Sequence, residues 1–155
     1  MIITGFQGES EGAKVSVTGG FSPGSGQNGV SKAFIARDAA DFLLPGLPPH
    51  GHLEASGRGV LLLADGSRHE GDLFGAAKIA EGELVFTTNM TGYQESLTDP
   101  SFAGQVLTFT WPLLGNYGIA PGISESSGVW PRGVVCRELM MEPDHRHCIG
   151  TVHDL

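Results

Sequence analysis

The side chains with the clearest capacity for chemistry in this chain lie at residues 98–101, which read Thr-Asp-Pro-Ser. The Asp99 carboxylate can hydrogen-bond the backbone two residues on, and Pro100 fixes its own φ, so the segment is predicted to be a tight turn. Ser101 is then exposed on that turn, where its hydroxyl can donate and accept hydrogen bonds. The residues alone leave two interpretations open, a purely structural turn and a functional loop.

A second segment, Gly115-Asn116-Tyr117-Gly118, carries glycines on both sides of an Asn-Tyr pair. Glycines placed in this way suit positive φ or a close approach of the backbone to a neighbour. Taken alone, so short a motif is a weak signal of function.

The cysteines and histidines are the remaining candidates. Cys136 ends an apolar run at residues 134–136 and lacks the flanking glycines of a nucleophile elbow, so we predict a buried cysteine that packs as a small hydrophobe. Cys148 follows the His-Arg-His run at residues 145–147 and precedes His153. Cys and His can bind zinc, but this spacing matches no strong zinc pattern, so we predict no metal ligand and keep metal binding as a weak alternative.

Composition excludes several classes of protein. A formal net charge of −8 with no basic run argues against nucleic-acid binding, which depends on Lys and Arg at phosphates. No apolar stretch approaches the ~20 residues of a membrane span, and the first residues do not resemble a secretory signal. Two cysteines are too few for a disulfide scaffold. We therefore expect a soluble cytoplasmic protein.

The N-terminal third is expected to differ from the rest. Of the 24 glycines, 11 precede Arg58, and residues 16–31 have the Gly, Ser and Pro content of a linker. We predict that residues 1–57 are a disordered extension, and the alternative is a short docking helix within residues 32–47. A non-Met start at Val60, which would leave these residues untranslated, is a further hypothesis.

The remaining residues, 58–155, are predicted to form one strand-rich domain. Expected strands lie at residues 59–64, 67–74, 83–88, 105–110 and 132–139, and Asp65-Gly66 should form a hairpin turn between the first two. Residues 91–99 contain better helix formers, with Thr91 as a possible N-cap.

The order of these motifs closely resembles the N-terminal domain of the small (glutamine-amidotransferase) subunit of carbamoyl-phosphate synthase. That family carries a run like G-E-x-V-F-x-T-x-M-T-G-Y-Q-E, then L-T-D-P-S, a strand, and P-L-I-G-N-Y-G. The matching positions are residues 82–83, 85–86, 88, 90–95, 97–101, 112–113 and 115–118, with further similarity at 125–126, 132–135 and 137–139. The resemblance extends from Val60 to Leu155 and weakens after Leu139.

The resemblance implies an α/β, strand-rich fold, a three-layer β/β/α swivelling domain. In the family this domain joins the small subunit to the large synthetase subunit, and the Ser of L-T-D-P-S reaches glutamine bound mainly by the following glutaminase domain. Ser101 is the corresponding residue here. It would orient glutamine without acting as the nucleophile.

By the same resemblance, the complete enzyme is a ligase that makes carbamoyl phosphate from glutamine, bicarbonate and ATP for pyrimidine and arginine synthesis. ATP and magnesium are expected on the large subunit and no cofactor on this chain. The chain holds no catalytic residue, since the Cys-His-Glu half of a class I amidotransferase is missing, so alone it should be inactive.

Two features of the C-terminal part remain open. The family commonly carries P-S-x-x-R here; Pro143 fits, whereas Asp144 and His147 replace the expected Ser and Arg. Residues 151–155 fall where the next helix of the family begins, and we interpret the chain as a fragment of a longer protein. The competing hypothesis is a stand-alone binding module that binds metal through its His/Cys tail.

Overall fold

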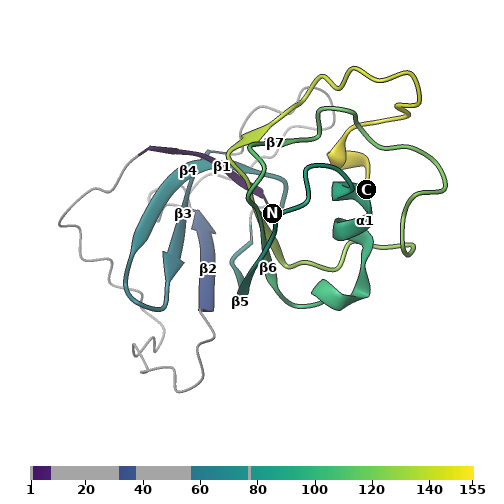
Figure 1. The fold of residues 1–155 in the computed structure, drawn as a ribbon. Coiled ribbons are helices and arrows are strands. Elements are labelled where there is room, and N and C mark those ends of the chain that lie inside the picture. Colours follow the sequence, from purple (N-terminus) through teal and green to yellow (C-terminus); the bar gives the residue numbers. More distant parts are fainter. Residues whose placement is uncertain (1, 8–31, 38–56, 77) are drawn as a thin grey trace.

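A computed structural model describes residues 2–7, 32–37, 57–76 and 78–155, and these residues form a strand-rich structure with one short α-helix (Figure 1). The strands are β1 (Ile2–Gln7), β2 (Lys32–Arg37), β3 (Arg58–Leu63), β4 (Arg68–Phe74), β5 (Ala80–Thr87), β6 (Val106–Phe109), β7 (Leu113–Leu114), β8 (Gly133–Val135) and β9 (Glu138–Leu139). The helices are α1 (Tyr93–Thr98) and the 3₁₀ turns η2 (Pro100–Phe102) and η3 (Val152–Asp154). None of the described helices is long and apolar enough to cross a membrane.

Seven of the described strands close into a barrel in the order β1-β4-β3-β2-β5-β6-β8, with β8 pairing back to β1. The pairs among β1 to β5 are antiparallel, whereas β6 runs parallel to both β5 and β8. A parallel pair needs a crossover connection. The crossover from β5 to β6 contains α1, and this connection places the candidate turn outside the barrel.

Two hydrophobic clusters fill the part of the domain that the structure describes. One gathers Ala33, Ile35, Leu61, Leu73, Ala80, Val106 and Val135 from six strands of the barrel. The other packs α1, through Tyr93 and Leu97, against β6 and β8. Neighbouring residues Val106 and Leu107 belong to different clusters because successive side chains of a strand point to opposite faces. The middle of the sheet is thus buried on both faces, with α1 covering the outer one.

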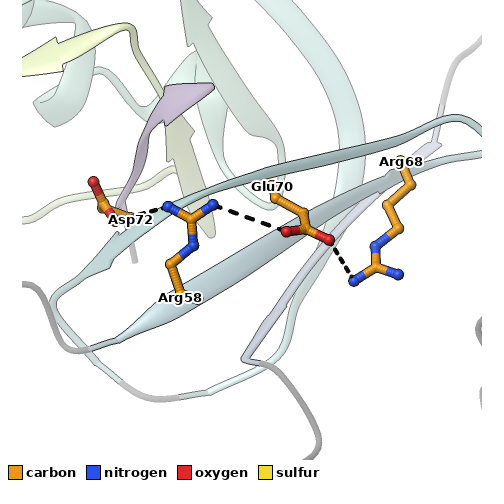
Figure 2. A network of polar contacts seen from close by, with 4 residues as sticks. All are labelled: Arg58, Arg68, Glu70 and Asp72. Atoms are coloured by element: carbon orange, nitrogen blue, oxygen red, sulfur yellow. Dashed lines mark hydrogen bonds and ion pairs between the residues drawn. The ribbon is translucent and has the colours of Figure 1, made fainter. Parts of the chain in front are cut away.

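The β3–β4 hairpin confirms the predicted turn at Asp65-Gly66. Backbone bonds join Leu63 N–H to Ser67 O and Gly66 N–H to Leu63 O, at 2.9 and 3.0 Å. Arg58 on β3 links the two strands through acidic side chains of β4, and a further ion pair lies within β4 (Figure 2). Arg58 lies 3.3 Å from Asp72 and 3.8 Å from Glu70, and Arg68 lies 2.8 Å from Glu70. These groups are partly exposed, so each pair contributes at most about 1 kcal/mol.

The strands expected near residues 59–64, 67–74, 83–88 and 105–110 are confirmed as β3, β4, β5 and β6, and the strand-rich α/β class is confirmed with them. The single strand expected at residues 132–139 is wrong. It divides into β8, which pairs within the barrel, and β9, which leaves it to pair in parallel with β7. The sequence of these eight residues does not reveal such a change of pairing partner.

The predicted helix at residues 32–47 is wrong where the structure describes it, because Lys32–Arg37 is strand β2 between β3 and β5. The apolar residues of Lys32–Arg37 fit either a helical or a strand pattern. Ala33 and Ile35 are fully buried at the two-residue spacing of a strand. Residues 38–47 lie outside the described residues. Within the expected extension, residues 2–7 and 32–37 are ordered as barrel strands, while the linker at residues 16–31 lies outside the description. The division into residues 1–57 and 58–155 stays a prediction.

Candidate functional site

Helix α1 begins at Gly92, whose backbone is hydrogen-bonded by a side chain from a later loop. Gly92 is the N-cap with φ of 83°, a left-handed conformation that glycine adopts without strain, and it has no side chain of its own to cap the helix. The N-cap predicted at Thr91 is therefore wrong. The Tyr117 hydroxyl accepts instead from the backbone N–H of Gly92 at 2.7 Å and of Tyr93 at 3.3 Å. A side chain from a distant loop thus satisfies donors that a helix start leaves unpaired.

Tyr93 and Tyr117 hold each other in place. Their rings stack with centroids 4.2 Å apart and planes 21° from parallel, and the Tyr93 hydroxyl donates to the Gly118 carbonyl. Burial raises the pKa of both phenols above the ordinary value, so both hydroxyls stay protonated at neutral pH. The stack joins the two motif segments on which the resemblance depends.

Gly118 confirms the predicted close approach. Its φ is +67°, and a Cβ at this position would overlap Cys148 Sγ and the Gly150 carbonyl. The segment that carries Tyr117 is therefore clamped against residues 148–150, and Ile119 pairs with Gly150 in an isolated bridge.

Gln94 ties α1 to the next loop. Its side-chain amide donates to the Ala120 carbonyl at 2.9 Å and to Ser124 Oγ at 2.8 Å, while its Oε1 accepts from Ala120 N–H at 2.8 Å. The side chain is buried, so an unpaired amide here would be costly. Gln94 thus holds α1 and the loop together by buried hydrogen bonds, and its amide is not free to bind a ligand.

The C-terminal end of α1 is held by the loop that follows. Thr98 Oγ1 donates to Gln94 O at 2.8 Å and accepts from Glu125 N–H at 2.9 Å. Ser126 Oγ donates to Thr98 O at 2.6 Å and accepts from Trp130 Nε1 at 2.7 Å. These bonds fix the backbone immediately before Asp99.

The turn at Asp99 and Ser101 has the predicted form. Asp99 Oδ1 accepts from the Ser101 backbone N–H at 2.8 Å and from Ser101 Oγ at 2.7 Å. These two bonds lower the pKa of Asp99, so its carboxylate is ionised at neutral pH. Pro100 opens η2, and Ser101 is exposed to solvent. The predicted site residue therefore lies on the surface of the domain, on a turn with fixed geometry.

The chemistry open to Ser101 is binding. Its hydroxyl donates to a carboxylate of low basicity, and no hydrogen bond in the described residues joins it to a histidine. A serine nucleophile needs an adjacent base, and Asp99 with its lowered pKa is a poor one. The arrangement can present a hydroxyl to a ligand but does not activate it for attack.

The other predicted candidates lie apart from this turn. Cys136 is 1% exposed, and burial raises its pKa to about 12, which confirms the predicted core cysteine. Cys148 is partly buried, and its Sγ donates to Gly150 O. The described part of the chain contains no group of three His, Cys, Asp or Glu side chains that could hold a metal ion.

Sequence reasoning missed the roles of Gln94, Tyr117 and Ser126. Each side chain holds a loop by hydrogen bonds, and their partners lie up to 30 residues away in the sequence. One signal was available: the helix at residues 93–98 has mostly polar residues. A polar helix can be buried only if its side chains find hydrogen-bond partners, so such partners were to be expected. Their partners could not be identified from spacing.

The family described as carbamoyl-phosphate synthase small chain, CPSase domain, matches residues 61–155. The carbamoyl phosphate synthase small chain of Symbiobacterium thermophilum is 46% identical over 92 residues, which are 59% of this chain and 25% of that relative. The namesake from Methanosarcina mazei is 47% identical over 96 residues, 62% and 26% of the two chains. That from Methanopyrus kandleri is 51% identical over 88 residues, 57% and 24%. This chain spans about a quarter of the length of these curated relatives. It belongs to the carbamoyl-phosphate synthase small chain family.

Proposed function

We propose that this domain serves a glutamine-hydrolysing carbamoyl-phosphate synthase and that Ser101 contacts glutamine held by the rest of the small chain. The observation that carries the proposal is an exposed hydroxyl on a turn fixed by the bonds of Asp99 and Thr98. A ligand contact needs both properties, because a buried serine cannot reach a second domain and a mobile one binds weakly. The test compares glutamine and ammonia as nitrogen donors after Ser101→Ala.

The second part of the proposal is that the domain docks the small chain to the large synthetase chain. Three large apolar side chains support it, since Phe86, Met90 and Trp111 are 70%, 62% and 42% exposed. Phe86 is near the end of β5, and the bond from Thr110 N–H to Thr87 O holds the segments with Met90 and Trp111 side by side. Large apolar side chains exposed on neighbouring segments favour an interaction surface there.

Co-purification with the large chain tests the docking proposal. The complete small chain with Phe86→Ser and Met90→Ser should bind the large chain at least about tenfold more weakly, because the apolar contact is lost. Ile149→Ser is the matched control, since Ile149 is 68% exposed but lies in another loop. Unchanged binding of the double variant would contradict this surface.

The remaining assignments follow the family. The complete complex would be a cytoplasmic ligase of pyrimidine and arginine synthesis, with ATP and magnesium acting on the large chain, and the isolated domain would be inactive. The fold would be the three-layer β/β/α swivelling type. Two observations support it: one hydrophobic cluster lies between the strands of the barrel, and a second cluster packs α1 against β6 and β8. Zinc binding by the His/Cys tail is not favoured, because the described residues offer no ligand group of three.

A further inference from the structure

We propose that Asp99 is a positioning residue for Ser101, fixing the Ser101 hydroxyl in the orientation that meets glutamine. This inference rests on the proposed role of Ser101 and adds a residue to it. Asp99 does not need to touch glutamine. Its effect would pass entirely through the serine.

The geometry of the carboxylate supports this role. A single oxygen, Asp99 Oδ1, accepts from both the backbone N–H and the Oγ–H of Ser101, at 2.8 and 2.7 Å. The two bonds fix Ser101 at its backbone and at its χ1 rotamer together. An exposed serine hydroxyl would otherwise exchange among three staggered rotamers, and binding would have to select one of them.

Asp99 is itself held firmly. It is the N-cap of η2, its carbonyl accepts from Phe102 N–H at 3.1 Å, and Pro100 fixes φ at the next position. On its other side, the Thr98 carbonyl is bonded by Ser126. A carboxylate on a fixed backbone can transmit that order to the hydroxyl it binds.

The chain contains the same arrangement a second time, remote in sequence from Ser101. In the β3–β4 turn, Asp65 Oδ1 accepts from Ser67 N–H at 2.8 Å and from Ser67 Oγ at 2.6 Å. The Asp-x-Ser arrangement by itself is thus a turn-stabilising device. Asp65 is therefore a matched control for every effect that comes from the turn alone.

The experiment uses the complete enzyme, with small and large chains, and steady-state kinetics with glutamine and with ammonia. Asp99→Ala should raise KM for glutamine about three- to tenfold, with ammonia-dependent turnover unchanged, since one fixed hydroxyl contact is loosened. Asp99→Asn should recover most of this loss, because the amide oxygen can still accept both bonds. Asp65→Ala should leave KM for glutamine unchanged.

A double-mutant cycle decides whether Asp99 acts through Ser101. In a Ser101→Ala background, Asp99→Ala should change KM for glutamine less than about twofold, because the hydroxyl to be oriented is gone. If the increase in KM for glutamine in the double variant equals the product of the increases in the two single variants, the positioning role is overturned. An equal loss with ammonia would also overturn it, since it would indicate general damage to the domain.

Two further outcomes are separable. If Ser101→Ala leaves KM for glutamine unchanged, the proposed role of Ser101 fails, and this inference fails with it. If Ser101→Ala raises KM but Asp99→Ala does not, only the inference fails. Should Asp99→Ala not fold, Asp99→Glu keeps the charge and displaces the acceptor by one methylene, and it should raise KM in the same way.

Discussion

The hydroxyl of Tyr117 lies 2.7 Å from the backbone nitrogen of Gly92 and accepts its hydrogen bond. This contact joins the start of α1 to a loop 25 residues further along the chain. It explains why Gly92 can begin a helix without a capping side chain of its own. It also holds the two motif segments together beside the hydrophobic cluster that packs α1 against β6 and β8. The turn with Ser101 follows directly from the far end of the same helix.

Replacing Tyr117 by Phe should destabilise the domain by about 1–3 kcal/mol, because two backbone donors lose their acceptor at a partly buried helix start. The ring stack with Tyr93 would remain. Chemical denaturation of the wild type and the variant measures the free energy of unfolding. Thr91→Ala is the control, and it should cost less than about 0.5 kcal/mol because Thr91 is exposed and caps nothing. A larger effect at Thr91 than at Tyr117 would contradict the observed cap.

Gly118→Ala and Gly122→Ala form a matched pair, since both glycines have positive φ, of 67° and 78°. Gly122→Ala should cost about 1–2 kcal/mol from backbone strain alone, because nothing lies within 4 Å of its added Cβ. Gly118→Ala should cost a further ~1–3 kcal/mol, because its Cβ meets Cys148 and Gly150. Equal unfolding free energies for the two variants would argue against the close approach at Gly118.

The two thiols should react at very different rates. Cys136 is 1% exposed with its pKa raised to about 12, whereas Cys148 is partly exposed in a loop. With a thiol reagent at pH 8, we expect Cys148 to react on the order of 100-fold faster than Cys136 in the folded protein. Cys148→Ser should abolish the fast phase, and denaturant should make both thiols reactive. A fast phase that persists in Cys148→Ser would place Cys136 nearer the surface than its burial allows.

Stability should fall as the pH drops through the ordinary histidine pKa of 6.5, because burial lowers the pKa of His153 in the folded state. The unfolded chain then binds the proton more readily than the folded one, so His153 stabilises the fold above pH 6.5 and loses that contribution below it. Its Nε2 is buried without a hydrogen-bond partner in the described structure. Denaturation midpoints at pH 5.5 and 7.5 should differ less in His153→Gln than in the wild type. An unchanged difference would assign the pH dependence to other groups.

The local patterns that the sequence predicted well are those decided by near neighbours. The Asp65-Gly66 turn, the Asp99 turn and the burial of Cys136 each depend on a few adjacent residues. The split of residues 132–139 and the strand at Lys32–Arg37 depend on which distant strand is available as a partner, and no local pattern encodes that.

The site shows the same division. The exposure of Ser101 and its bond to Asp99 confirm the predicted turn, whereas its contact with glutamine stays a prediction from the resemblance. The side chains that hold α1 and the turn are those of Gln94, Ser126 and Tyr117. The sequence does not predict their roles, because their hydrogen-bond partners are brought near only by the tertiary fold. Polar networks depend on tertiary geometry and leave little periodic trace in a sequence.

The most direct test of the account compares nitrogen donors in the complete enzyme with Ser101→Ala. If Ser101 contacts glutamine, KM for glutamine should rise about tenfold, equivalent to the loss of one hydrogen bond, while ammonia-dependent turnover stays at the wild-type value. Ser67→Ala provides the control, since Ser67 makes the same bonds in another turn. Equal losses with glutamine and ammonia, or no loss with either, would contradict the central claim that this turn contributes to the glutamine site.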